Sequence, residues 1–215
     1  MESTRIIAIR HGETIWNTQG RIQGHIDIGL NEKGKEQAHL VGQAFSTSDI
    51  IVDAIYSSDL QRAFSTAEPI ALATELPITK DSRLRERHFG DFEGKTWIDI
   101  DEHSPEVSIK WKERDPVWRP GEGSESLYDL DARVKVVVSE LANRHLGSQI
   151  VIVSHGGVMD ILYRWATGQD IQAPRTWSIE NAVINRLLWT PGGLSLLSWG
   201  DKEHLDSISK DDSAA

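Results

Sequence analysis

A histidine stands between an arginine and a glycine near the start of the sequence, in the run Arg10-His11-Gly12. A histidine in such a run can be a packed core residue, a metal ligand, a general base or a nucleophile, and taken alone the structural role is favoured. Its neighbours change this balance, because Arg10 places a permanently charged guanidinium beside the imidazole and Gly12 lets a ligand approach the backbone. Asn17 adds an amide donor and Arg21 a second guanidinium. The pattern therefore indicates that His11 takes part in chemistry.

A second histidine, His155, occupies the same kind of position. The apolar runs at 5–9 and 150–153 each predict a strand buried on both faces, and each run leads into a histidine followed by glycine. Sites in open parallel sheets form just beyond the carboxyl ends of the strands. We therefore expect His11 and His155 to lie at the same edge of one sheet, although they are far apart in the sequence.

Helices and further strands fill the remaining sequence. Hydrophobic spacing and capping residues predict helices over 31–45, from 57–59 to before Pro77, over 127–141 and over 157–168. Strands are predicted over 54–56, and as a hairpin over 183–190 and 194–199. The β–α alternation predicts an α/β protein, a three-layer αβα fold with a mostly parallel central sheet. We expect a single domain over residues 1–205 and a disordered polar tail over 206–215.

The segment 94–123 does not fit this alternation. It carries three tryptophans, at positions 97, 111 and 118, among charged residues and prolines, and its helical periodicity is poor. One interpretation is a lid or insertion that covers the site, since long irregular segments in compact domains are often functional. The alternative is a packing flap whose tryptophans shield an edge of the core.

Composition excludes several classes of function. The formal net charge of −10 argues against nucleic-acid binding, which needs a positive face. The longest apolar runs are too short to cross a membrane or to serve as a signal-peptide core. The sequence has no cysteine, which excludes a thiolate metal site or a thiol nucleophile and suits a cytoplasmic location. A small phosphorylated substrate remains compatible, because a few clustered arginines can form a positive pocket in an acidic protein.

Several motifs, taken together, resemble the signature of the histidine phosphatase superfamily, which includes phosphoglycerate mutases and many small-molecule phosphatases. The matching blocks occur in the expected order: Arg10-His11-Gly12-Glu13-Thr14 with Trp16-Asn17 and Gly20-Arg21-Ile22-Gln23-Gly24; Ser57-Ser58-Asp59-Leu60-Gln61-Arg62-Ala63; Leu84-Arg85-Glu86 with Phe89-Gly90; Glu125-Ser126 with Arg133; and Ser154-His155-Gly156-Gly157. Each block is weak alone, and five in order are specific. Ser124 departs from the pattern, because the family usually has glycine there.

The resemblance implies a phosphoglycerate mutase-like fold and a phosphomonoesterase that hydrolyses a small phosphorylated metabolite without a metal or other cofactor. His11 would be the nucleophile that forms a phosphohistidine, and Glu86 the general acid and base. Arg10 and Arg62 would hold the phosphoryl oxygens, and His155 would donate a hydrogen bond to the same group. Substrate contacts are implied for Asn17, Arg21 and Gly156.

Other functions stay open on the same residues. A 2,3-bisphosphoglycerate-dependent phosphoglycerate mutase is the main alternative, because residues 86–90 look mutase-like, but the stretch from Glu86 to His155 is shorter than in the mutases. A catalytically inactive phosphate- or protein-binding module is a lesser alternative. The presence of Glu86 beside His11 argues against it, since such a module would not need an acid beside the nucleophile. A metal hydrolase is disfavoured, as the sequence has no HExxH motif. The oligomeric state is open, with a homodimer as one alternative.

Overall fold

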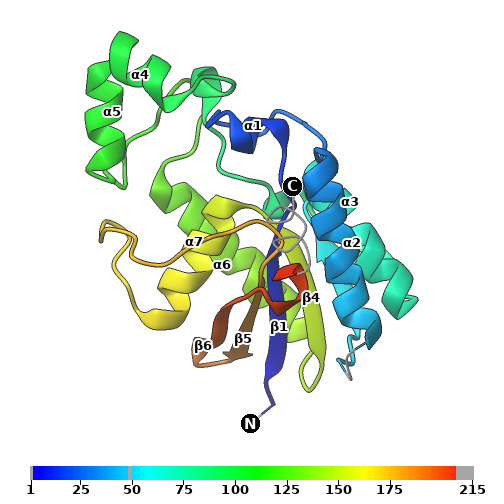
Figure 1. Ribbon diagram of the computed structural model, residues 1–215. Coiled ribbons are helices and arrows are strands. Elements are labelled where there is room, and N and C mark those ends of the chain that lie inside the picture. Colours follow the sequence, from blue (N-terminus) through cyan, green and yellow to red (C-terminus); the bar gives the residue numbers. More distant parts are fainter. Residues whose placement is uncertain (1, 48–49, 207–215) are drawn as a thin grey trace.

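A six-stranded sheet forms the centre of the protein (Figure 1). The computed structural model describes residues 2–47 and 50–206, so the predicted tail lies outside the described residues from position 207 on. The strands are β1 (Thr4–Arg10), β2 (Ala54–Ser57), β3 (Ile78–Lys80), β4 (Gln149–Ser154), β5 (Ile184–Thr190) and β6 (Gly193–Asp201).

The strands lie in the order β3-β2-β4-β1-β5-β6. The pairings of β1 with β4, of β2 with β4 and of β2 with β3 are parallel. The pairings of β5 with β1 and with β6 are antiparallel. The mostly parallel sheet predicted from the sequence is confirmed, and the predicted hairpin forms one of its edges.

Helices cover both faces of the sheet, which confirms the three-layer fold (Figure 1). The helices are α1 (Ile15–Thr18), α2 (Glu32–Thr47), α3 (Gln61–Thr74), α4 (Trp97–His103), α5 (Pro105–Lys112), α6 (Leu127–Arg144) and α7 (Gly156–Thr167), and the short 3-10 turns are η1 (Ser82–Leu84), η2 (Gly90–Phe92) and η3 (Glu203–Leu205). Helices α2 and α3 pack on one face of the sheet, and α6 and α7 on the other.

Strand β1 shows why the layers form. Its side chains alternate between the two faces, as in any strand. Ile6 and Ala8 belong to the core cluster that contains α6 and α7, whereas Ile7 and Ile9 belong to the cluster that contains α2 and α3. All four are at most 2% exposed. Burying one such aliphatic side chain stabilises the fold by about 1.5–3 kcal/mol as an upper estimate, so an apolar run on both faces requires helices on both sides.

Side-chain caps fix the helix starts near the carboxyl ends of the strands. Asn31, predicted as a cap, accepts a hydrogen bond at Oδ1 from the backbone N–H of Gly34 at 2.8 Å. Asp27 reaches from a loop to accept the N–H of Gln61 at the start of α3, at 2.7 Å. Ser126 forms a capping box at the start of α6. Each cap satisfies an N–H that a helix terminus leaves free.

The segment 94–123 is more regular than its sequence suggests, so the expectation of an irregular excursion is wrong for its first half. Residues 97–112 form α4 and α5, of seven and eight residues. Helices this short show little periodicity, and their starts are set by the capping box at Thr96 and by Pro105 at the first helical turn. Around Ile100 they form a small hydrophobic cluster together with Ile22 and Phe89. They lie apart from the layers, beyond the carboxyl end of β1 (Figure 1).

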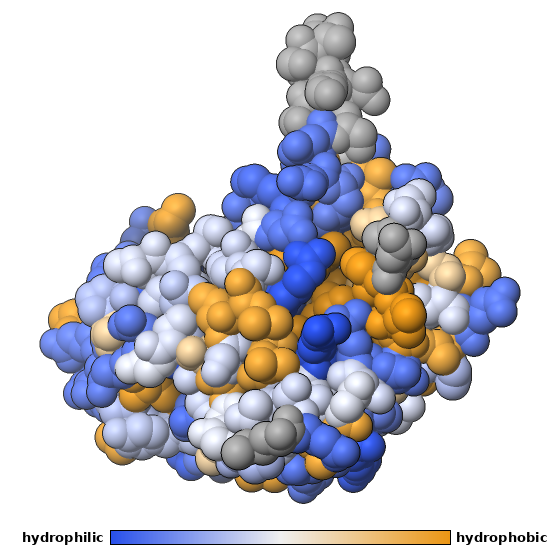
Figure 2. Space-filling view, turned by 90° about the horizontal axis from the view of Figure 1, so that it is seen from below, coloured by the Kyte–Doolittle hydropathy of each residue, from blue (hydrophilic) through white to orange (hydrophobic). Residues whose placement is uncertain are grey.

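The surface seen from below carries several hydrophobic patches (Figure 2). Hydrophilic residues lie between these patches. Homodimer formation stays a prediction. Among the helices of residues 2–47 and 50–206, none combines the length and the apolarity needed to cross a bilayer.

Two glycines let the loop after His11 lie directly on α2. A Cβ atom on Gly34 would lie 2.0 Å from the backbone oxygen of Glu13, and one on Gly12 would lie 2.5 Å from the backbone oxygen of Gly34. Real Cβ atoms do not approach backbone this closely, so neither position accepts a side chain without moving the loop.

We therefore expect Gly34→Ala to destabilise the protein by about 1–3 kcal/mol, as overpacking does. The sign is informative, because glycine to alanine inside an exposed helix ordinarily stabilises by about 1 kcal/mol. Urea unfolding of the variant measures the change, with Lys35→Ala, at the exposed neighbouring position, as the control. A gain in stability for Gly34→Ala would show that the close contact is not present.

Candidate active site

The predicted site residues meet at one edge of the sheet. His11 follows β1 and His155 follows β4, and because these strands are paired, the backbone N–H of His11 donates to Ser154 O at 2.9 Å. The two imidazole centroids are 5.2 Å apart, so the expected meeting of the histidines is confirmed. A cavity of about 300 Å³ opens over them, and its lining includes Arg10, His11 and Arg62.

His11 is held in one tautomer. It is 2% exposed, and its Nδ1 lies 2.7 Å from the backbone oxygen of Gly12. A carbonyl oxygen can only accept, so Nδ1 carries the proton and Nε2 keeps a free lone pair. Burial, followed by the charges of Arg10 and Arg62, holds the pKa of His11 well below its usual range. The side chain is therefore neutral at pH 7 and can act as a nucleophile.

Two guanidiniums flank this imidazole, and backbone carbonyls hold both. Arg10 donates from Nη1 to Ile179 O at 2.6 Å. Arg62, in the first turn of α3, donates to Gly24 O at 2.7 Å and to Ile26 O at 2.9 Å. Burial lowers the pKa of Arg62 to about 10, so it remains charged at pH 7. The buried Nε atoms of both arginines have no hydrogen-bond partner among the described residues.

His155 contributes a third unpartnered donor position. Its Nε2 lies 2.8 Å from the hydroxyl of Ser58, and its buried Nδ1 has no partner among the described residues. Burial, and then the charge of Arg62, holds the pKa of His155 well below its usual range. An unsatisfied buried polar group costs about 1–3 kcal/mol. The Nε atoms of Arg10 and Arg62 and the Nδ1 atom of His155 can therefore form hydrogen bonds with the oxygens of an anion bound beside His11.

Glu86, which follows η1 in the chain, lines the same cavity, and its carboxylate lies next to the first turn of α7. Its carboxylate accepts the backbone N–H of Gly157 at 3.0 and 3.1 Å, and the N–H of Arg87 at 2.8 Å. These bonds fix the carboxylate in place without covering it with a salt bridge. The predicted acid and the predicted nucleophile therefore share one cavity.

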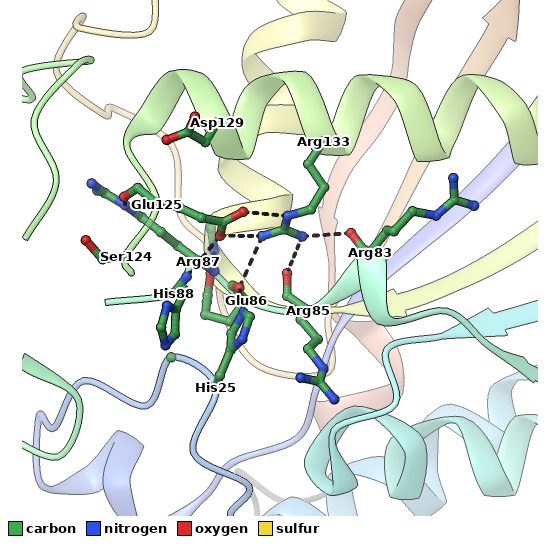
Figure 3. Close-up of polar contacts among 12 residues, drawn as sticks. His25, Arg83, Arg85, Glu86, Arg87, His88, Ser124, Glu125, Asp129 and Arg133 are labelled. Atoms are coloured by element: carbon green, nitrogen blue, oxygen red, sulfur yellow. Dashed lines mark hydrogen bonds and ion pairs between the residues drawn. The ribbon is translucent and has the colours of Figure 1, made fainter. Parts of the chain in front are cut away.

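Arg133 braces the backbone that carries Glu86 (Figure 3). It forms a two-pronged ion pair with Glu125, at 2.7 and 2.6 Å. From the same guanidinium it donates to the carbonyl oxygens of Arg83, Arg85 and Glu86. Ser124 replaces the usual glycine of the family. Its hydroxyl accepts the backbone N–H of Gly121 and donates to the Gly121 carbonyl oxygen, and the ion pair of Arg133 with Glu125 is intact.

The three residues expected to contact the substrate peripherally all line the cavity, namely Asn17, Arg21 and Gly156. The side-chain oxygen of Asn17 accepts a hydrogen bond from the backbone N–H of Thr14 and so completes the capping box at the start of α1. Arg21 donates to Gly94 O at 2.7 Å, so it also ties α1 to the segment 94–123. Gly156 begins α7 beside the Arg10 guanidinium.

Other lining residues are not predicted from the sequence. Gln23 belongs to a block that resembles the family, and this was the only signal for it. Arg87, Arg114 and Arg175 also line the cavity, together with Trp97 and Trp111. In segment 94–123, Trp97 and Trp111 pack together and also line the cavity. Both interpretations of this segment, as a lid and as a packing flap, stay open. Its movement as a lid stays a prediction.

Comparison with known proteins identifies the family of the chain. The sequence profile of the histidine phosphatase superfamily (branch 1) matches residues 6–202, and the chain belongs to this family. It is 37% identical over 209 residues to phosphoglycerate mutase-like protein 4 of Arabidopsis thaliana, covering 96% of this chain and 89% of that protein. It is 36% identical over 209 residues to a metal-independent phosphoserine phosphatase of the same plant, with coverage of 96% and 85%.

A solved structure shares the fold. A mycobacterial glucosyl-3-phosphoglycerate phosphatase in complex with VO3 superposes with a TM-score of 0.81 at 31% identity, covering 92% of this chain and 99% of that one. Within residues 2–47 and 50–206, no group of three or more His, Cys, Asp or Glu side chains is arranged to hold a metal ion.

The neutral histidines predict how stability depends on pH. A buried His11 stays unprotonated in the folded protein, whereas in the unfolded chain it binds a proton below its ordinary pKa of 6.5. Its contribution to stability is therefore complete above that pKa and is lost as pH falls below it. Between pH 7.0 and 5.5 we expect His11 to account for a loss of about 1 kcal/mol in the free energy of unfolding.

Urea unfolding of the wild type and of His11→Ala at both pH values measures this difference. The variant should lose about 1 kcal/mol less than the wild type on acidification. His39→Ala, at an exposed position on α2, is the control and should behave as the wild type. Parallel losses in wild type and His11→Ala would contradict a lowered pKa for His11.

Proposed function

We propose that this protein is a phosphomonoesterase that hydrolyses a small phosphorylated metabolite through a phosphohistidine on His11, without a metal ion. The observation that carries the proposal is the set of three buried, unpartnered nitrogens, on Arg10, Arg62 and His155, around the free lone pair of His11. A phosphoryl group offers the oxygens that such donors need. Relatives named metal-independent phosphoserine phosphatase and glucosyl-3-phosphoglycerate phosphatase support the same reaction class.

In the first half of the reaction, Nε2 of His11 attacks phosphorus in line with the ester oxygen. The new N–P bond forms as the P–O bond to the leaving group breaks. Arg10 and Arg62 stabilise the charge on the non-bridging oxygens, and His155 donates from Nδ1 when the Ser58 hydroxyl donates to its Nε2. Glu86, in its protonated form, gives its proton to the leaving alkoxide.

In the second half, water replaces the alcohol. The Glu86 carboxylate takes a proton from the water as its oxygen attacks phosphorus, and the N–P bond breaks. Inorganic phosphate leaves, His11 returns to its neutral form, and Glu86 is again protonated. The guanidiniums supply the positive charge that a metal ion supplies in other phosphatases, so no divalent cation is required.

The mutase alternative is less well supported. A mutase must keep water from the phosphohistidine while its product reorients, which demands a closed cover and several contacts to the rest of the substrate. Here α4 and α5 lie apart from the layers beyond the strand ends (Figure 1). Relatives carry both names, including a probable phosphoglycerate mutase of Yersinia pestis. A cytoplasmic location and a homodimer stay predictions.

Replacing the nucleophile tests the proposal. His11→Ala should lower phosphate release by at least about a thousandfold, as loss of a covalent nucleophile does in other enzymes. After brief exposure to a labelled phosphomonoester, acid-labile phosphate should be trapped on the wild type and not on the variant, and turnover should survive exhaustive chelation. Near wild-type activity in His11→Ala, or activity that returns only with a divalent ion, would overturn the proposal.

Replacing the acid tests the role of Glu86. Glu86→Gln keeps the shape but cannot give a proton, so hydrolysis of an alkyl phosphate should fall by about 10²–10⁴-fold. The loss should be much smaller with p-nitrophenyl phosphate, whose leaving group needs little protonation. Steady-state kinetics on both substrates measures the two losses, with Glu36→Gln, exposed on α2, as the control. Equal losses would show that Glu86 is structural and would direct the test to Asp91 and Glu93.

A further inference from the structure

The wall of the cavity over His11 contains a buried arginine that forms no ion pair with the described residues. Arg87 is 3% exposed, and its hydrogen bonds go to the carbonyl oxygens of Glu125 at 2.9 Å and of Trp118 at 3.3 Å. Its guanidinium also lies over the rings of Phe89 and Trp111, at 5.3 and 5.6 Å. None of the ion pairs among the described residues includes Arg87. Burial lowers its pKa to about 10, so it is charged at pH 7.

A second guanidinium completes this wall from the loop after α7. Arg175 is exposed, and it has no hydrogen bond or ion pair with any residue that the structure describes. It lines the cavity over His11, and its charge is close enough to lower the pKa of Arg10. Ile179, four positions along the same loop, accepts the hydrogen bond from Arg10. Arg175 therefore stands near the phosphoryl site but outside it.

The cavity continues beyond these two arginines. A second cavity of about 330 Å³ adjoins the first, and both are lined by Arg87 and Arg175. The other basic residues of the second cavity have anionic partners: Lys110 pairs with Asp115, Lys112 with Asp101, and Arg114 with Asp160. The positive charge left unpaired thus lies at the junction of the two cavities.

We propose that Arg87 and Arg175 form a subsite for a carboxylate on the part of the substrate that is not transferred. The inference rests on the proposed phosphatase function and narrows its substrates to phosphomonoesters that also carry a carboxylate. A guanidinium matches the two coplanar oxygens of a carboxylate, and a buried unpaired charge gains most from an anionic partner. Arg87 also donates its backbone N–H to Glu86, so the subsite adjoins the acid.

Matched substrates test the subsite by kinetics. 3-Phosphoglycerate and glycerol 3-phosphate share a three-carbon skeleton and a phosphate, and differ in having a carboxylate or a hydroxymethyl group. Wild-type kcat/KM should favour 3-phosphoglycerate by at least about tenfold, which corresponds to about 1.4 kcal/mol. Arg175→Gln should reduce this preference to about threefold or less. O-Phosphoserine and O-phosphoethanolamine form a second pair that keeps the ammonium group constant.

The control variant removes the same charge elsewhere. Arg5→Gln, at the opposite end of β1, changes the net charge equally and should keep the wild-type preference. Arg87→Gln should reduce the preference as Arg175→Gln does, provided that its urea unfolding shows a folded protein. Equal kcat/KM for both substrates in the wild type, or an unchanged preference in Arg175→Gln, would overturn the subsite.

A binding measurement separates the subsite from the reaction. His11→Ala cannot form a phosphohistidine, so calorimetry can compare its affinity for the two phosphates without turnover. Tighter binding of 3-phosphoglycerate by at least about tenfold, lost in His11→Ala with Arg175→Gln, would support the subsite even if the hydrolysis proposal fails. Equal affinity would overturn the subsite, while trapping of phosphate on wild-type His11 would leave the phosphatase proposal standing.

Discussion

The site depends on keeping an imidazole neutral beside two buried positive charges. Arg10 and Arg62 cannot lose their protons at physiological pH, so the proton that gives way is that of His11. The same charges that prevent protonation of the histidine attract an anion to it. The proposed nucleophile and its substrate would therefore depend on one electrostatic arrangement, and its effect is strongest where these groups are buried.

Backbone carbonyls from two loops hold the two arginines in this arrangement. If two buried guanidiniums are to keep their positive charge available for an anion, their acceptors must carry no negative charge, and carbonyl oxygens of Gly24, Ile26 and Ile179 meet this need. A carboxylate in their place would neutralise the charge that the phosphoryl group needs. These carbonyls come from the loops between α1 and α2 and between α7 and β5, which lie at the carboxyl ends of the parallel strands together with the site.

Much of this was predictable from the sequence, for reasons that differ between residues. The strands before His11 and His155 were predicted because both are buried on two faces and therefore continuously apolar. Glu86 is predicted from motif resemblance alone, whereas Arg62 is also marked by its place just after a strand-to-helix turn. Arg175 carries no signal, because it lies in an irregular loop whose position depends on packing.

The carbonyl acceptors of the two arginines also could not be predicted from the sequence. Backbone oxygens are present at every position, so no residue type reveals that Ile179 holds Arg10. The helices α4 and α5 were missed because each is shorter than the span over which a helical pattern can be recognised. Sequence patterns thus predict what is periodic or chemically distinctive, and they leave out what depends on tertiary contacts.

The position of β4 in the sheet determines when the site can form during folding. β4 is inserted between β2 and β1, both of which precede it by many residues. Until it pairs with them, His155 is absent from the edge and the Arg10 loop has no neighbouring strand. The contact order of the site is therefore high, and a chain still emerging from the ribosome cannot bind phosphate there before most of the domain has been synthesised.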